Sequence, residues 1–331
     1  MHPVSQNSPV PVTGKPLMSI AILFLFVFHL SPKTLNAQAL GQLQGAVSGS
    51  EYAQFPAAGD ATVYTVAAGF NVYFVSVGQG DAIYLELPNG QNALIDGGPS
   101  SSASGPLARF LTARNITNID HVVLTHPHSD HYKGLQYVFA NLSVANFYDT
   151  RIDNTGATGD NTLRDKISAL GVNTAYPAAG DQLAWGGDVA VKVFNSCPQT
   201  QQSSKSPVIN NCSITLKVAY QDSSLLFTGD IEADIEASLV ARYGEELKAD
   251  VLKVAHHGSQ YSSSDAFLGA VRPQRAYIEV GKNNYGHPTQ SALGRLLAAG
   301  ISVFRTDQDG TQVYPPVAFA GMASANVSFA Y

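Results

Sequence analysis

Six of the nine histidines in this 331-residue chain lie in three short polar clusters. The six are His126, His128, His131, His256, His257 and His287. The first cluster has the spacing His-x-His-x-Asp-His, with Asp130 as its acidic member. A lone histidine is most often a hydrogen-bonded structural residue, but imidazoles gathered with carboxylates are typical ligands of zinc, manganese or iron. The sequence therefore predicts a transition-metal site.

The first cluster directly follows a short apolar run that we expect to be a buried strand. Side chains at i and i+2 of an extended loop point to the same side, so His126 and His128 can bind one cation together. Asp130 and His131 come where the chain turns into the next helix, and they can face a second cation. Two ions about 3.5–4 Å apart need a shared ligand. Asp230 ends the segment Phe-Thr-Gly-Asp after another apolar strand, and it is the candidate bridge.

Strand-like and helix-like segments alternate from Phe70 onward and must position these residues. The runs Asn71–Val77, Ala82–Leu87 and Asn92–Ile95 are β-branched and aromatic, and a Pro-Asn-Gly turn joins the last two. Pro106–Arg114 begins with proline and has apolar residues at helical spacing. The second half of the chain repeats this alternation. The pattern predicts two packed sheets covered by helices.

Seven motifs in order carry a resemblance to a known family. They are Val77–Ala82 (VGQGDA), Leu94–Gly98 (LIDGG), Leu124–His131 (LTHPHSDH), Phe227–Asp230 (FTGD), Leu252–Ser259 (LKVAHHGS), Tyr285–Pro288 (YGHP) and Arg305–Asp307 (RTD). Over roughly residues 70–310 the chain resembles the metallo-β-lactamase superfamily, in particular the soluble hydrolase domain of the competence DNA-uptake protein ComEC and secreted phosphorylcholine esterases. The resemblance implies the α/β class and an αββα four-layer sandwich with metals at one edge.

The resemblance also implies a ligand set for two divalent ions, with Zn²⁺ expected and Mn²⁺ as the alternative. The set is His126, His128, Asp130, His131, Asp230 and His256, with Asp230 shared. Many members of the superfamily place a third histidine on the first ion, and no histidine occurs between His131 and His256 here. The first site is therefore expected to be the weaker one. The family usually has an aspartate where Ser76 stands, and Asp96 is expected to brace the metal loop.

Adjacent residues in an extended chain point to opposite sides, so His256 and His257 are not both expected at one ion. We expect His256 to be the ligand and His257 to contact substrate or to orient His256. His287 has two interpretations: a structural, hydrogen-bonded histidine, or a residue that binds or protonates substrate. The expected catalytic residues are thus Asp130, His257 and His287.

A two-cation site suits phosphodiester hydrolysis because it stabilises both the attacking and the leaving oxygen. We therefore expect an exported dinuclear-metal-dependent hydrolase that uses metal-activated water on a small-molecule or nucleic-acid phosphodiester, nuclease-like or of the phosphocholine-ester type. Two alternatives remain: a lactam or lactone hydrolase of the same fold, and a non-catalytic, metal-stabilised binding module. The net charge of −6 argues against strong nucleic-acid binding. A local basic patch could still form from Lys248, Lys253, Arg272, Arg275 and Lys282.

Residues 1–39 have the features of a signal peptide. Ile20–Leu30 is an apolar run too short for a membrane span, and Ala37–Ala39 is a small-residue cleavage site. The alternative is a buried N-terminal helix. We expect a secreted or periplasmic protein cleaved near Ala39, with no membrane span in the mature chain.

The rest of the chain divides into a leader arm over 40–69, the hydrolase domain over 70–315 and a C-terminal tail over 316–331. The two cysteines, Cys197 and Cys212, form either a disulfide or a pair of free thiols. An oxidising compartment favours the disulfide.

Overall fold

The computed structural model describes residues 69–314. The expected signal peptide, almost all of the leader arm and the C-terminal tail lie outside the described residues. None of the helices in the described part is long and apolar enough to cross a membrane.

The first of two seven-stranded sheets comes mainly from the N-terminal half of the described chain. Its strands are β1 (Asn71–Phe74), β2 (Ile83–Glu86), β3 (Asn92–Ile95), β4 (Asn118–Val123), β5 (Ser143–Tyr148), β7 (Asn173–Ala175) and β16 (Gln312–Tyr314). They lie in the order β16-β1-β2-β3-β4-β5-β7. The pairs from β3 to β7 are parallel, and the others are antiparallel.

The second sheet comes from the C-terminal half. Its strands are β8 (Gln182–Leu183), β9 (Ala190–Asn195), β11 (Thr215–Tyr220), β12 (Ser223–Phe227), β13 (Val251–Lys253), β14 (Arg275–Ile278) and β15 (Ser302–Arg305). They lie in the order β15-β14-β13-β12-β11-β9-β8, with β12 to β15 parallel. A separate two-stranded parallel ladder joins β6 (Ile152–Asn154) to β10 (Gln201–Ser203).

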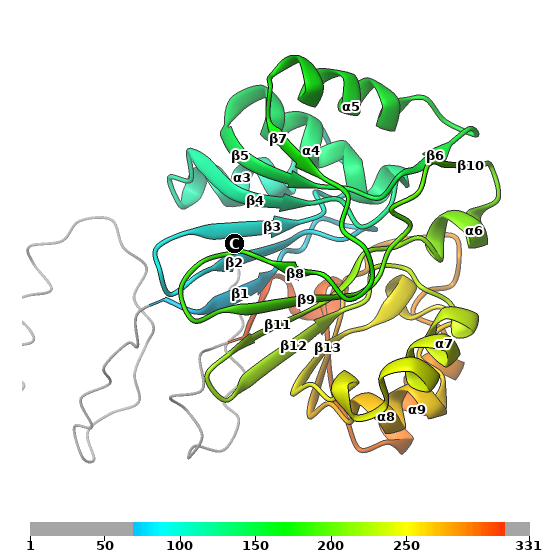
Figure 1. The fold of residues 1–331 in the computed structure, drawn as a ribbon. Helices are drawn as coiled ribbons and strands as arrows, with labels where there is room; N and C mark the ends of the chain where they lie inside the picture. The colour runs from blue at the N-terminus through cyan, green and yellow to red at the C-terminus, as the bar shows by residue number, and fades with distance from the viewer. Residues whose placement is uncertain (1–68, 315–331) are drawn as a thin grey trace, which may run out of the picture. The chain divides into compact units, whose positions relative to one another are not determined.

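Helices cover the outer face of each sheet (Figure 1). Those on the first sheet are α3 (Pro106–Ala113), α4 (Ser129–Asn141) and α5 (Gly159–Ala169). Those on the second are α7 (Ala233–Tyr243), α8 (Asp265–Val271) and α9 (Gln290–Ala298). Short helices complete the set: α6 (Ser206–Asn210), η1 (Gly244–Leu247), η2 (Ala255–Gly258) and α10 (Thr306–Asp309). The predicted αββα four-layer sandwich is confirmed.

An apolar core fills the space between the sheets. Phe74 of β1 stacks on Tyr277 of β14, with ring centroids 4.1 Å apart, and Trp185 is fully buried in the same cluster. Burial of these large side chains on both inner faces stabilises the pairing of the sheets. The sheets are therefore held in a fixed relation, which lets them share a site at one edge.

Loops in the described region are fastened by specific contacts. Cys197 and Cys212 form a disulfide, as one of the two alternatives predicted. Ser76 stands where the family usually has aspartate. Its hydroxyl donates a hydrogen bond to the carbonyl of Thr306, and no hydrogen bond between the described residues joins it to the metal loop. Its role is thus to hold the segment that follows β15.

Candidate metal centre

The predicted metal loop lies at the carboxyl end of β4. The strand ends at Val123, the loop carries His126 and His128, and Asp130 and His131 fall in the first turn of α4. His128 is the N-terminal cap residue of this helix. The chain therefore changes from strand to helix within the motif, as its spacing predicts.

Other parallel strands end at the same edge and bring further donors there. Asp96 follows β3, Asp230 follows β12, and the adjacent histidines follow β13. The Oδ2 atom of Asp230 lies 3.8 Å from Nε2 of His126 and 3.4 Å from Nε2 of His131. Because ligand sites in α/β proteins form beyond the carboxyl ends of parallel strands, this convergence follows from the topology.

The structure favours His257 over His256 as the histidine that joins His126 and His131 at the centre, which reverses the sequence-based assignment. His257 is buried, and its Nε2 lies 3.5 Å from both Asp130 Oδ2 and Asp230 Oδ2. His256 is turned away, with its Nδ1 3.8 Å from Glu232. Both histidines have positive φ, at 50° and 53°, so the backbone coils here and the alternation expected of an extended chain does not apply.

Three imidazoles use Nδ1 to fix their orientation and leave Nε2 facing the cluster. His131 Nδ1 lies 2.8 Å from Asp96 Oδ2, and His257 Nδ1 lies 2.8 Å from the carbonyl of Glu279. His126 Nδ1 contacts the hydroxyl of Ser213 at 3.2 Å. Such partners fix the tautomer and the ring plane of metal-binding histidines. The pattern is that of imidazoles prepared to bind through Nε2.

The donors fit divalent cations. Within residues 69–314, sets of three donor atoms lying within 4.8 Å of one another include His126–His131–Asp230, Asp130–His131–His257 and Asp81–Asp230–His257. The Nε2 atoms of His131 and His257 are buried and have no hydrogen-bond partner. Buried polar atoms without partners are costly, so their convergence indicates a place for a ligand. Imidazole and carboxylate donors suit Zn²⁺, Mn²⁺ or Fe²⁺.

Two predicted residues lie near the cluster but outside these donor sets. His128 Nδ1 is 2.9 Å from His126 Nε2, and its other ring nitrogen is 3.2 Å from the Ser206 hydroxyl. His287 packs against His256, with ring centroids 5.2 Å apart. His128 and His287 thus lie next to the donor sets without belonging to them.

Asp96 braces the metal loop, as predicted. Its Oδ1 accepts the backbone N–H of Thr125 at 2.8 Å, and its Oδ2 accepts the Thr125 hydroxyl at 2.7 Å and faces His131. One buried carboxylate therefore fixes the start of the loop and the ring at its end.

Three buried ionisable residues at the centre were missed or given other roles in the sequence analysis. Asp81 lies 3.2 Å from His257 Nδ1 and also pairs with the ammonium of Lys253. Glu279 is fully buried and accepts the backbone N–H of Ala82. A signal existed for two of them, because Lys253 and Glu279 interrupt otherwise apolar strand sequences. Charged residues are seldom fully buried unless they are paired.

The local charges attract cations. Burial alone would lower the pKa of His257, but Asp230 and Asp81 raise it to about 10. Burial would also lower the pKa of His131, but Asp230 and Asp96 raise it well above its usual value. Burial opposes ionisation of Asp230, but His257 and His131 hold its pKa well below the usual range. Without metal, protons on the two imidazoles supply the positive charge that divalent ions would bring.

His126 and His287 behave differently. Burial lowers the pKa of His126 well below its usual value. Burial and then the nearby His256 and His257 lower the pKa of His287 to about 4. His287 is therefore neutral at pH 7.

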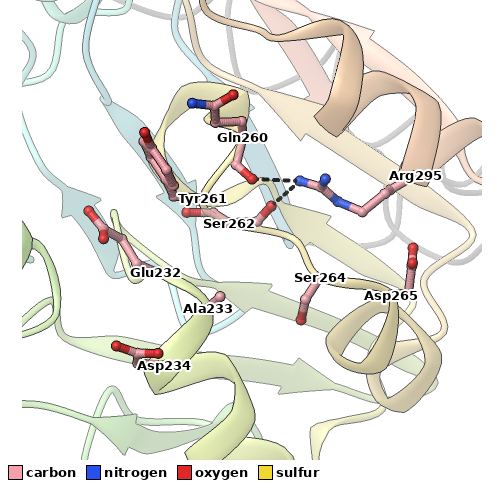
Figure 2. A pocket seen from close by; sticks show the side chains of 9 residues that line it. All are labelled: Glu232, Ala233, Asp234, Gln260, Tyr261, Ser262, Ser264, Asp265 and Arg295. Carbon is pink, nitrogen blue, oxygen red and sulfur yellow. Dashed lines mark hydrogen bonds between the residues drawn. The ribbon is translucent and has the colours of Figure 1, made fainter.

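A pocket of about 460 Å³ is lined by residues that include Glu232, Ser262 and Arg295 (Figure 2). Glu232 lines it and connects it to His256, while Arg295 donates to the carbonyls of Gln260 and Ser262. None of the predicted ligands lines this pocket. The arginine holds the loop that follows the adjacent histidines.

Two of the five residues of the suggested basic patch are not free surface cations. Lys253 is 1% exposed and belongs to the interior, and Arg272 pairs with Glu245. Neither side chain is thus a free surface cation for a phosphate backbone.

Comparison with known proteins gives the same family. Residues 75–179 match the metallo-beta-lactamase superfamily. The chain is 30% identical to ComE operon protein 3 of Bacillus subtilis (strain 168) over 284 residues, covering 77% of this chain and 36% of that protein. It is 32% identical to competence protein ComA of Neisseria gonorrhoeae over 242 residues, covering 70% and 30%. The chain thus spans about a third of the length of these relatives.

Among solved structures, the chain is similar to CmlA, a diiron beta-hydroxylase from Streptomyces venezuelae. The TM-score is 0.51 at 13% identity, covering 75% of this chain and 54% of that one. This likeness concerns the fold alone. Sequence match, four-layer fold and clustered donors agree that the chain contains a metallo-beta-lactamase superfamily domain.

Proposed function

We propose that the protein is an exported, dinuclear-metal-dependent hydrolase that acts on phosphodiesters. The observation that carries the proposal is the sharing of donors: Asp230 belongs to one set with His126 and His131 and to another with Asp81 and His257. A carboxylate common to two sets is what two neighbouring cations require. Two divalent cations held there would lower the pKa of water and offset the charge that develops on a phosphoryl group.

The chain's own residues divide the remaining work. Asp96 and the Glu279 carbonyl orient His131 and His257, so that no ring has to turn when a ligand arrives. Asp130 lies between the inner donors and the solvent, with its side chain 29% exposed. His287 is neutral and half-buried at the rim, where it can donate a hydrogen bond to substrate. Asp130 and His287 are thus our candidates for substrate-side contacts.

Phosphodiesters are favoured over lactams or lactones by the predicted relationship to DNA-uptake hydrolase domains and by the suitability of paired cations for phosphoryl groups. The curated relatives named as competence proteins are in keeping with this preference. Lys253 is buried and Arg272 pairs with Glu245, so neither is free to bind a phosphate backbone. This favours a short strand end or a small phosphodiester over tight binding of long duplexes.

The test is a parallel assay of the purified full-length protein loaded with Zn²⁺ or Mn²⁺. We expect hydrolysis of bis-p-nitrophenyl phosphate or of single-stranded DNA, lost in Asp130→Ala. Turnover of nitrocefin alone would overturn the phosphodiesterase proposal. Bound metal without turnover of any substrate, in wild type and Asp130→Ala alike, would favour the non-catalytic binding module.

Export is part of the proposal. The disulfide between Cys197 and Cys212 supports it, because disulfides persist in oxidising compartments. We expect N-terminal sequencing of the secreted or periplasmic protein to begin near Leu40. Exported material that still begins at Met1 would contradict cleavage near Ala39.

A further inference from the structure

Lys253 is a fully buried lysine that the proposed mechanism does not use. It ends β13, in the interior of the second sheet, and is 1% exposed. Its ammonium pairs with Asp81 Oδ2, donates to the carbonyl of Gly229 at 3.1 Å and lies 3.7 Å from Asp230 Oδ1. A buried ammonium is costly unless it is paired, so these contacts explain how it is tolerated but not why it is present.

Asp230 divides its two carboxylate oxygens between opposite surroundings. Oδ1 lies 3.7 Å from the ammonium of Lys253. Oδ2 faces the three imidazoles, at 3.8 Å from His126 Nε2, 3.4 Å from His131 Nε2 and 3.5 Å from His257 Nε2. The backbone N–H of Asp230 is bonded to Ser213, which fixes the main chain but not the carboxylate plane.

We propose that Lys253 is a positioning residue that sets the plane of the Asp230 carboxylate, so that one oxygen alone faces the cation site. Carboxylates can bind a cation through one oxygen or through both. Attraction of Oδ1 by the ammonium would disfavour binding of one cation by both oxygens and would leave Oδ2 available to both donor sets. This inference rests on the proposed two-cation function and adds a cause for its geometry.

The surrounding charges fit this role. The ammonium of Lys253 lies between two carboxylates, pairing with Asp81 and facing Asp230 Oδ1 at 3.7 Å. These neighbours favour a positive charge at this position. A merely structural lysine would be satisfied by Asp81 and Gly229, and its loss would affect folding without a specific effect on ion binding.

The first test compares Lys253→Met with wild type. Methionine keeps most of the length and apolar volume and removes the charge. The readouts are Mn²⁺ stoichiometry and affinity by titration calorimetry, with folding followed by circular dichroism. We expect the folded variant to bind the second Mn²⁺ about 10–100-fold more weakly, the size of effect seen when partners of metal ligands are removed. Arginine at this position, in Lys253→Arg, should restore part of that affinity.

Lys217→Met is the matched control. Lys217 lies on β11, is half-buried, and donates to backbone carbonyls at Glu246 and Lys248. Its loss removes a lysine from the same sheet without touching Asp230, so both Mn²⁺ affinities should equal those of wild type. A folded Lys253→Met protein that also binds two Mn²⁺ ions with wild-type affinity would overturn the proposal.

A second variant covers the case in which Lys253→Met does not fold, because Asp81 would be left buried without its cation. Lys253→Gln covers this case, because its amide can still donate a hydrogen bond to Asp81 while the charge that faces Asp230 is removed, and Asp81 itself is left in place. We expect it to fold and to retain the weakened second Mn²⁺ site, and wild-type binding of both ions by this variant would overturn the role of Lys253.

Failure of the two proposals can be told apart. A wild-type protein that binds two Mn²⁺ ions but hydrolyses no phosphodiester would overturn the proposed substrate class. The proposal for Lys253 would still be tested in that case, because its readout is Mn²⁺ affinity. A wild-type protein that binds no Mn²⁺ or Zn²⁺ would overturn both.

Discussion

At the scale of single residues, the centre depends on which nitrogen each imidazole presents. His131 and His257 use Nδ1 for a carboxylate and a backbone carbonyl, and their Nε2 atoms meet at Asp130 and Asp230. His256, the neighbour in sequence, faces Glu232 instead. Residue identity alone therefore does not define the ligand, because the direction of the ring decides it.

Replacing each of the adjacent histidines in turn tests this assignment. We expect His257→Asn to lower metal affinity by more than about 10-fold, since even partners outside the coordination sphere contribute that much. His256→Asn should keep the metal content of wild type, because its ring lies outside the donor sets. Metal content is measured by elemental analysis after dialysis, and the reverse order of effects would restore the sequence-based assignment.

The charge state of His257 predicts a pH dependence of the metal-free protein. Its pKa is about 10 in the folded protein, against 6.5 for an ordinary histidine side chain, which is the value expected in the unfolded chain. The folded state binds the proton more tightly, so the stabilisation is complete below about pH 6.5 and is lost as the pH rises towards about 10. Urea unfolding in EDTA should therefore show a free energy of unfolding that falls over this range.

His257→Gln provides the control for the pH experiment, and it should reduce the slope. An increase in the stability of the metal-free wild type between about pH 7 and 9.5 would show that His257 is not protonated in the folded state.

At the scale of elements, α4 must approach the loop after β3 closely to present Asp130 and His131. Gly97 donates its N–H to the carbonyl of His131 at 2.7 Å, and Gly134 donates to the carbonyl of Gly98 at 3.0 Å. These contacts need the absence of a side chain on the facing surface of the helix. The glycine pair thus sets the position of the helix that carries two of the donors.

Gly134→Ala should therefore destabilise the protein, although alanine normally stabilises the interior of a helix. The added Cβ would fall on the carbonyl group of Gly97, 2.6 Å from its carbon. Overpacking of this kind costs about 1–3 kcal/mol. Chemical unfolding measures the loss, and weaker Zn²⁺ binding should accompany it as α4 shifts.

Gly294→Ala is the matched substitution in α9. No atom lies within 4 Å of the Cβ it would add, so we expect it to stabilise the protein by about 0.5–1 kcal/mol. Equal effects of the two substitutions would argue against close packing at Gly97.

At the scale of the described domain, the centre draws its donors from both sheets. His126, Asp130 and His131 follow a strand of the first sheet, while Asp230 and His257 follow strands of the second. The apolar core between the sheets fixes their separation. Cations bound at the shared edge would join the two halves, and so should stabilise the folded state.

Removal of metal tests this link. EDTA should lower the melting temperature, and Zn²⁺ restored at about 100 times its dissociation constant should raise the free energy of unfolding by about 2.7 kcal/mol. Asp230→Asn, which weakens the shared ligand, should lose most of this gain. Identical melting curves with EDTA and with Zn²⁺ would contradict a metal centre that spans the sheets.

Much of the fold and part of the site could be predicted from the amino-acid sequence alone. Alternating strand and helix patterns and the ordered motifs gave the four-layer fold, because hydrophobic periodicity and motif spacing are local properties of the chain. The position of the His-x-His-x-Asp-His segment at a strand end followed from the apolar run before it. Asp230 could be selected for the same reason.

Tertiary structure decided the rest, because it depends on groups far apart in sequence. The left-handed turn at His256 and His257 determines which ring faces Asp230, and no local pattern reports that turn. Lys253 ends β13 and Glu279 directly follows the neighbouring β14, and both meet Asp81 only when the two sheets pack. Burial strengthens the electrostatic interactions between these charges and makes an unpaired charge costly. Their contribution therefore arises only in the folded chain.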